Sequence, residues 1–213
     1  AWILLIKALQ SDSKDVFYIG PTFQQAKDIM WAMLKELGDE LIAAAHENTA
    51  VLTLINGRKI YLKGSDRPDT LRGVGLSYVV LDEYASMKPD VWEKIIRPTL
   101  ADVKGGALFI GTPEGKNHFY DLWEMAGIEE NTEWEQFQYN STDNPLIDPE
   151  EIKVARETMS TQAFRQEFEA SFVSFTGGIF KSDWIKYDED EPEEGNYVIA
   201  VDPAGFENVE KER

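Results

Sequence analysis

Two adjacent acids, Asp82 and Glu83, follow a short apolar run and are the residues of this sequence best suited to chemistry. The run, Tyr78 to Leu81, has the continuous apolar character of a central strand in a parallel sheet. Side chains at the carboxyl end of such a strand project into the crevice where open α/β sheets bind ligands. There the first acid can hold a Mg²⁺ ion that bridges nucleotide phosphates, and the second can orient and deprotonate an attacking water. The alternative is structural: Asp82 caps the following helix and Glu83 is solvated.

A second polar strand end is predicted at Gly111-Thr112-Pro113, which follows the apolar run Ala107 to Ile110. A threonine hydroxyl in this position could sense the γ-phosphate or the attacking water and so report the nucleotide state. The alternative is an ordinary strand-to-helix turn. An earlier run, Asp15 to Gly20, ends in Pro21-Thr22 in the same way, so three polar strand ends are predicted.

Alternating strands and helices must position these residues. The hydrophobic pattern predicts strands at 15–20, 51–55, 59–62, 78–81, 107–110 and 134–139, and helices at 1–9, 24–37, from about 89, 116–125, 150–158 and 161–170. Asn56-Gly57 is typical of a tight turn and joins the second and third strands as a hairpin. This order favours an α/β fold with a mostly parallel sheet and helices on both faces.

Composition limits the kind of protein. The 213 residues allow one α/β domain and part of another. Cysteine is absent and only two histidines occur, so a bound metal would be a hard ion held by carboxylates. The formal charge of −18 means that contact with a polyanion needs a local basic patch. No apolar run is long enough for a membrane span, and no secretory signal is recognisable.

The most basic stretch of this acidic chain lies between residues 58 and 72. Its cations are Arg58, Lys59, Lys63, Arg67 and Arg72, against only Asp66 and Asp69. These cations could contact nucleic-acid phosphates or a neighbouring subunit. The alternative is a solvated hairpin edge, where Lys and Arg discourage aggregation.

A domain boundary is predicted near residue 176, where Thr176-Gly177-Gly178 interrupts the pattern before an acidic loop at 188–194. A new buried-strand signal, Tyr197 to Val201, then ends in Asp202. The expected organisation is a domain at 1–175, a linker at 176–195 and the start of a second domain at 196–213.

The phosphate-binding pattern GxxxxGK[ST] does not occur in this sequence. The chain opens with an apolar helix at Ala1 to Leu9, and in a P-loop fold a helix comes directly after such a loop. We therefore expect an N-terminus truncated just after that loop, and a polypeptide that hydrolyses ATP poorly by itself.

Several segments, in this order, resemble the large subunit of bacteriophage-type DNA-packaging terminases. They are YIGPTFQQAKDIMWAMLKEL (18–37), GSDRPDTLRGVGLSYVVLDEYA (64–85), FIGTPEGKNHFYDLW (109–123), STDNP (141–145) and FRQEFEASFVSFTGGIF followed by YVIAVDPAG. The resemblance implies a P-loop ATPase domain joined to an RNase H-like nuclease. It implies a motor that uses ATP and Mg²⁺ to move double-stranded DNA into a procapsid, with Mg²⁺ or Mn²⁺ for the nuclease.

The resemblance also implies partners: further copies in a ring, a portal protein and the terminase small subunit, in the host cytoplasm and without a membrane.

The resemblance also implies roles for individual residues. It makes Asp82 the Walker B metal ligand, Glu83 the catalytic base, and Gly111-Thr112-Pro113 the coupling motif. Arg72 matches an arginine proposed to reach a neighbouring subunit's ATP; the alternative is a surface ion pair with Asp66 or Asp69. Asp202 becomes the first metal-binding acid of the nuclease. The remaining nuclease acids would lie beyond Arg213, so this chain is not expected to cut DNA.

Two other functions fit the same strand ends. One is a helicase-like nucleic-acid translocase, which would separate the strands of a duplex. The other is a non-catalytic assembly module that keeps a nucleotide-binding fold.

Overall fold

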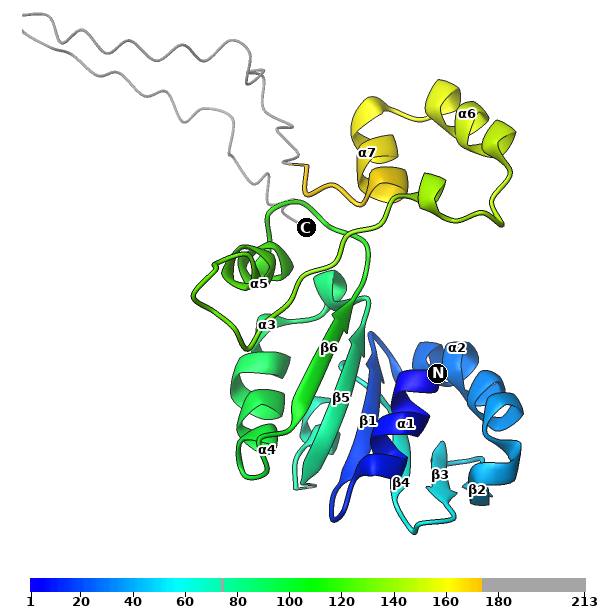
Figure 1. The fold of residues 1–213 in the computed structure, drawn as a ribbon, viewed down its shortest axis with the longest axis vertical. Helices are drawn as coiled ribbons and strands as arrows, with labels where there is room; N and C mark the ends of the chain where they lie inside the picture. Colours follow the sequence, from blue (N-terminus) through cyan, green and yellow to red (C-terminus); the bar gives the residue numbers. More distant parts are fainter. Residues whose placement is uncertain (74, 174–213) are drawn as a thin grey trace, which may run out of the picture. The chain divides into compact units, whose positions relative to one another are not determined.

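The computed structural model describes residues 1–73 and 75–173, which form a six-stranded sheet with helices on both faces (Figure 1). The strands are β1 (Asp15–Gly20), β2 (Ile42–His46), β3 (Val51–Leu54), β4 (Lys59–Gly64), β5 (Leu76–Asp82) and β6 (Gly106–Ile110). Their order in the sheet is β2-β3-β4-β1-β5-β6. The β4, β1, β5 and β6 strands are parallel, whereas β3 is antiparallel to both of its neighbours. The carboxyl ends of four strands therefore meet at one edge.

Seven α-helices occur in the part of the chain that the structure describes. They are α1 (Trp2–Gln10), α2 (Phe23–Leu37), α3 (Pro89–Val91), α4 (Arg97–Ala101), α5 (His118–Ala126), α6 (Pro149–Thr158) and α7 (Thr161–Glu169). A π-helical turn, Trp92–Ile96, joins α3 to α4.

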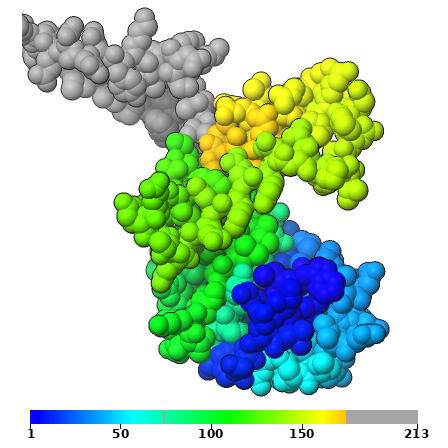
Figure 2. All heavy atoms as spheres, viewed as in Figure 1, coloured from blue at the N-terminus to red at the C-terminus, as the bar shows by residue number. Residues whose placement is uncertain are grey.

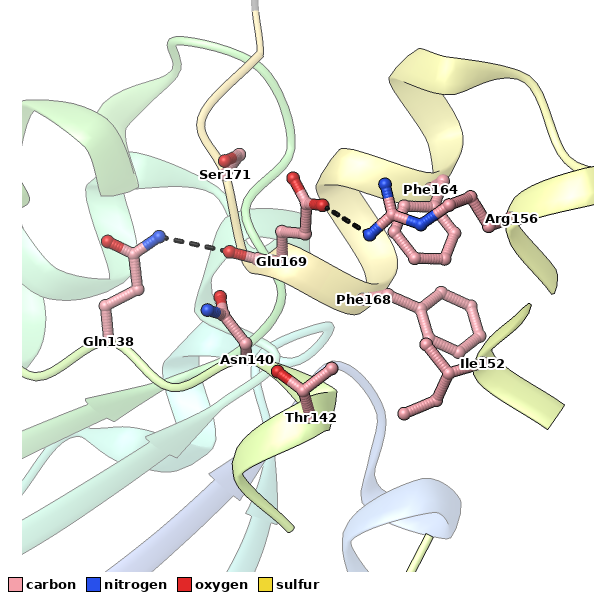
Figure 3. Close-up of a pocket in the computed structure, with 9 residues that line it drawn as sticks. All are labelled: Gln138, Asn140, Thr142, Ile152, Arg156, Phe164, Phe168, Glu169 and Ser171. Carbon is pink, nitrogen blue, oxygen red and sulfur yellow. Dashed lines mark hydrogen bonds and ion pairs between the residues drawn. The ribbon is translucent and has the colours of Figure 1, made fainter. Parts of the chain in front are cut away.

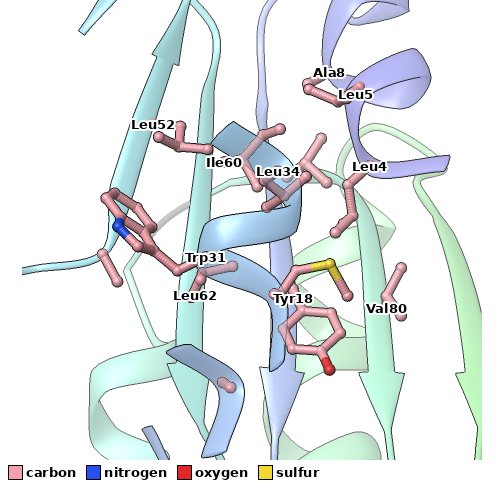
Figure 4. Close-up of a cluster of buried hydrophobic side chains, with 14 of the residues drawn as sticks. Leu4, Leu5, Ala8, Tyr18, Trp31, Leu34, Leu52, Ile60, Leu62 and Val80 are labelled. Carbon is pink, nitrogen blue, oxygen red and sulfur yellow. The ribbon is translucent and has the colours of Figure 1, made fainter. Parts of the chain in front are cut away.

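Side chains of the central strands alternate between two cores because successive residues of a strand face opposite sides. On β1, Tyr18 belongs to the core under α1 and α2, whereas Phe17 belongs to the core under α3 and α4. On β5, Val80 faces the first core and Leu81 the second. Figure 4 shows the first core between the sheet and the two helices. Burial on both sides fixes the register of β1 and β5.

Helix α2 begins and ends where its sequence dictates. The Thr22 hydroxyl accepts a hydrogen bond from the backbone N–H of Gln25 at 3.2 Å, which caps the first turn. Ala26, Met30 and Leu34 recur at helical spacing and are buried against the sheet. At the other end, the backbone N–H of Gly38 donates to the carbonyl of Leu34 at 2.9 Å and closes the last turn.

Most predicted elements are confirmed, including the hairpin at Asn56-Gly57, but the strand expected at 134–139 is wrong. In that segment Trp134 stacks on Phe109 with ring centroids 5.8 Å apart, whereas Phe137 and Tyr139 are exposed. The aromatic spacing imitates a strand, yet the segment pairs with no strand of the described residues. The predicted linker and second-domain strand, with Asp202, lie outside the described residues.

Strand β2 was not predicted. Its sequence, IAAAH, has three alanines, which are weak strand formers, and it lies at the edge of the sheet with mostly exposed side chains. The strand is therefore stabilised by its pairing with β3, because its own residues favour strand structure only weakly.

Candidate nucleotide-binding site

The three predicted polar strand ends lie at one edge of the sheet. Strand β5 sits between β1 and β6, with Ile19 opposite Leu81 and Asp82 opposite Ile110 in the parallel registers. Pro21-Thr22, Asp82-Glu83 and Gly111-Thr112 lie at or directly after these positions. The sheet thus brings together the residues that the sequence singled out at three separate places.

Asp82 projects toward the side of the sheet covered by α1. Its Oδ2 atom accepts a hydrogen bond from the Tyr18 hydroxyl, and its Oδ1 atom accepts one from the backbone N–H of Glu83 at 3.1 Å. Helix α3 begins only at Pro89, and its N-cap residue is Lys88. The alternative in which Asp82 caps the next helix is therefore wrong, and the half-buried carboxylate lies at the carboxyl end of β5.

Tyr18 is a site residue that sequence reasoning missed. It is fully buried on β1, and burial together with its hydrogen bond to Asp82 raises the pKa of its hydroxyl. The phenol therefore stays protonated and remains a donor to the carboxylate. The available signal was the hydroxyl of Tyr18 among the apolar residues Val16, Phe17 and Ile19, but its partner lies 64 residues away in sequence.

Glu83 has an exposed side chain on an unusual backbone. Its φ and ψ angles, 54° and 45°, lie in the left-handed region, which is uncommon for residues other than glycine. Such conformations persist where the surrounding structure enforces them, and they concentrate at functional sites. Partial desolvation first, and then the charge of Asp82, raise the pKa of the Glu83 carboxyl, whereas the backbone N–H of Thr112 lowers it.

The loop after β6 is fastened to the turn after Glu83. A Cβ atom at Gly111 would lie 3.2 Å from the backbone N of Tyr84, so a larger residue would push this backbone away. The Asn117 side-chain amide donates a hydrogen bond to the carbonyl of Ala85 at 3.0 Å, and His118 Nε2 donates to the carbonyl of Tyr84 at 3.1 Å. The segments that follow β5 and β6 are therefore in direct contact.

The amino end of α1 faces the same carboxylate. The backbone nitrogen of Ala1 lies close enough to Asp82 for the charge of the carboxylate to act on it. A helix amino end is a favourable place for a phosphate because its N–H groups are unpaired and its dipole is positive there. The outer side of this helix is open to solvent, since Trp2 and Ile6 are 56% and 45% exposed. Figure 2 shows the amino-terminal segment, in dark blue, at the surface of the molecule.

The basic stretch is divided between two ends of the sheet. Arg58 and Lys59 lie at the amino end of β4, whereas Arg67 and Arg72 flank a short helical turn beyond its carboxyl end. The six residues of β4 span roughly 20 Å. Lys63 lies between these groups, with its Nζ atom over the ring of Tyr61 at 5.6 Å. The five cations do not form one patch.

Arg72 lines a pocket of about 450 Å³ on the side of the sheet opposite the Asp82 side chain. The apolar wall of the pocket includes Met87 and Ile95 of the second core. Arg72 forms no ion pair with Asp66 or Asp69. The expected alternative of a surface ion pair is thus wrong.

A smaller pocket of about 280 Å³ lies between α6, α7 and the segment around Gln138 (Figure 3). The rings of Phe164 and Phe168 stack with centroids 5.0 Å apart. Arg156 lies over Phe164 and pairs with Glu169 at 3.1 Å. Because this guanidinium is paired within the chain, the pocket is a less suitable phosphate site than the strand ends.

The donor set at the strand ends suits magnesium. Among the described residues no group of three acids or histidines lies close enough to hold a metal ion by itself. Mg²⁺ is typically held by one or two carboxylates together with substrate phosphates and water, and Asp82 can supply such a carboxylate.

No helix in residues 1–73 and 75–173 is long and apolar enough to cross a membrane.

The fold is an α/β domain with a mostly parallel six-stranded sheet, whose polar strand ends meet at one edge. The family described as terminase large subunit, T4likevirus-type, N-terminal, matches residues 1–187. The chain belongs to this family.

Two curated relatives are the terminase large subunits of Escherichia phage T5 and Thermus phage G20c. The first is 31% identical over 180 residues, which is 82% of this chain and 41% of the relative. The second is 37% identical over 131 residues, which is 55% of this chain and 27% of the relative. The chain therefore spans less than half the length of either relative.

Solved structures agree with the fold. The ATPase domain of the Thermus phage P74-26 large terminase is 28% identical, with a TM-score of 0.66 over 79% of this chain and 80% of that domain. A large terminase from a thermophilic bacteriophage, solved in complex with ADP, is 15% identical, with a TM-score of 0.59 over 78% of this chain and 42% of that protein. The predicted family and the mostly parallel α/β fold are confirmed.

Proposed function

We propose that this chain carries much of the ATPase domain of a motor subunit that moves double-stranded DNA into a viral procapsid. The observation that supports it most is the meeting of Asp82-Glu83, Gly111-Thr112 and the amino end of α1 at one edge of the sheet. The proposed ligand is Mg-ATP, with its phosphates between α1 and the ends of β5 and β6.

Each strand-end residue has a role in this proposal. Asp82 would hold Mg²⁺, which would neutralise charge on the phosphates. Glu83 orients the attacking water and accepts its proton on the carboxylate, for which its exposed side chain and raised pKa are suited. Gly111 and Thr112 would respond to the occupancy of the site, and the bonds from Asn117 and His118 to Ala85 and Tyr84 would couple the turn after Glu83 to the start of α5.

The longer relatives extend the proposal to the whole protein. There Arg72 would act on the ATP of a neighbouring copy in a ring, and Asp202 would be the first metal-binding acid of an RNase H-like nuclease that uses Mg²⁺ or Mn²⁺. The partners would be duplex DNA, the portal protein and the terminase small subunit, in the host cytoplasm. The basic side chains other than Lys63 would contact DNA or a neighbouring copy.

The deciding experiment changes Glu83→Gln in the full-length protein. Loss of the general base is expected to lower the ATPase rate about 100- to 10,000-fold while Mg-ATP still binds. The matched control is Glu36→Gln, an exposed glutamate of α2, which should hydrolyse ATP at the parent rate.

Unchanged hydrolysis by the Glu83→Gln protein would show that the base is assigned wrongly. If the parent protein separates the strands of duplex DNA instead of moving it intact, the helicase-like alternative would replace the packaging motor. If it neither binds nor hydrolyses ATP, the assembly-module alternative would stand.

A further inference from the structure

The Asp82 carboxylate accepts a hydrogen bond from a residue of the neighbouring strand β1. Tyr18 lies opposite Val80 in the parallel register of β1 and β5, so Asp82 is two residues further along on the same face. Figure 4 shows the Tyr18 ring directed along the strand, with its hydroxyl toward the carboxyl end. This direction carries the hydroxyl to the Oδ2 atom of Asp82.

Packing alone does not call for a polar atom at position 18. The surrounding core is formed by apolar side chains, among them Leu4, Met30 and Val80, and Tyr18 is 0% exposed. A buried hydroxyl that lacks a partner is unfavourable, and within the described residues Asp82 is the hydrogen-bond partner of this one. The tyrosine is therefore explained by the carboxylate and not by the core.

The two oxygens of Asp82 are fixed by different donors. Tyr18 bonds Oδ2, and the backbone N–H of Glu83 bonds Oδ1. A carboxylate has about four lone-pair sites, so these two bonds define its plane and leave acceptor capacity directed elsewhere. Partners of this kind orient the side chains that bind metal ions.

We propose that Tyr18 is a positioning residue that fixes the Asp82 carboxylate for the divalent cation of a bound nucleoside triphosphate. The inference rests on the proposed function, because the cation-binding role of Asp82 belongs to it. Tyr18 acts through Asp82 and does not touch the nucleotide.

The test measures cation binding and not turnover. A fluorescent, non-hydrolysable ATP analogue is titrated with Mg²⁺ in the presence of the full-length protein and its Tyr18→Phe variant. Loss of the hydroxyl should raise the Mg²⁺ concentration for half-maximal effect about 10- to 100-fold. Binding of the analogue in EDTA should not change, because the phenyl ring still fills the core.

Tyr61→Phe is the matched control. Tyr61 lies on β4 opposite Phe17, and its hydroxyl faces Asp15 and not Asp82. This variant removes a tyrosine hydroxyl from the same sheet and should titrate with Mg²⁺ like the parent.

The Asp82→Asn background separates positioning from a general effect on folding. If Tyr18 acts through the carboxylate, Tyr18→Phe should change the Mg²⁺ response of the Asp82→Asn protein by less than about twofold. An equal loss in both backgrounds would overturn the inference.

Two further outcomes distinguish this inference from the function on which it rests. If Asp82→Asn weakens the Mg²⁺ response and Tyr18→Phe does not, the positioning role is wrong and the proposed function stands. If Asp82→Asn leaves the response unchanged, both are overturned.

Discussion

Gly111 and Glu83 lie against each other through their backbones: a Cβ atom on Gly111 would be 3.2 Å from the Cα atom of Glu83. The contact joins the ends of β6 and β5, where Glu83 adopts its left-handed conformation. Real Cβ atoms seldom approach backbone atoms so closely, and backbone cannot move aside as a flexible side chain can. Glycine at position 111 is therefore part of what places the proposed base.

Gly111→Ala should impair catalysis more than folding. The added methyl group would push the end of β6 away from Glu83, and a displacement near 1 Å can lower a rate about 100-fold. Overpacking typically costs about 1 to 3 kcal/mol of folding free energy, so a folded protein is expected. Steady-state ATP hydrolysis and thermal unfolding measure the two effects.

Gly127→Ala is the control for this substitution. A Cβ atom there would meet the side-chain amide of Gln136 at 2.9 Å, which is the movable end of a flexible side chain. Its ATPase rate should equal that of the parent. A Gly111→Ala protein with the parent rate would show that the contact does not position Glu83.

The sequence predicted the sheet well where the hydrophobic pattern was strong. Continuous apolar runs predicted β1, β5 and β6, and in the central strands β1 and β5 these runs are buried between the two cores. The pattern failed at β2, whose alanines carry little strand signal, and at 134–139, where Trp134 packs against the core without strand pairing.

The sequence could predict only those site residues that lie at the end of a recognisable strand. Asp82, Glu83 and Thr112 stand at the ends of recognisable strands, and parallel strands bring such ends together. The hydrogen bond from Tyr18 and the close approach of Gly111 depend on strand order and register, which no short segment encodes. The basic stretch looked continuous in sequence, but β4 separates its two ends.

Arg72→Ala should lower ATP hydrolysis about 1,000-fold or more if the arginine stabilises charge at the phosphates. Its position on the side of the sheet away from the Asp82 side chain favours action on a neighbouring copy. Binding of ATP should be largely retained. Hydrolysis and nucleotide binding are to be measured with the assembled full-length protein.

Mixing inactive variants tests the direction of this action. In mixed assemblies of Arg72→Ala and Glu83→Gln subunits, some interfaces combine an intact arginine with an intact glutamate. We therefore expect activity above that of either variant alone. Mixed assemblies that stay as inactive as the separate variants would contradict action between copies.

Glu47 should make the folding stability depend on pH below 4.5, the ordinary pKa of a glutamate. Its pKa lies below the usual 4.5, because Trp31 Nε1 donates a hydrogen bond at 2.7 Å and Lys27 and Lys35 lie nearby. A lowered pKa means that the folded state binds the proton less tightly than the unfolded state. The contribution of the Glu47 carboxylate to folding stability is thus fully present above pH 4.5. It is lost as the pH falls through the folded-state pKa of Glu47.

Glu47→Gln should consequently lower the unfolding temperature at pH 7, with a smaller difference from the parent at about pH 3. Glu36→Gln in α2 is the control: its unfolding temperature should stay close to that of the parent, since Glu36 has no ion pair among the described residues. A constant difference between Glu47→Gln and the parent across this pH range would rule out this account.

Within the basic stretch, Arg67 and Lys63 should differ in their effect on DNA binding. Arg67 is exposed beyond the end of β4, whereas the Lys63 ammonium lies 5.8 and 5.6 Å from the ring centroids of Phe17 and Tyr61, and burial lowers its pKa. A side chain that neutralises a phosphate releases a counterion, so losing one such contact reduces the salt slope of binding by about 1. We expect this reduction for Arg67→Gln and not for Lys63→Gln, measured by duplex DNA binding at several salt concentrations. Equal salt slopes for Arg67→Gln and the parent would show that Arg67 does not neutralise a DNA phosphate and belongs to a solvated edge.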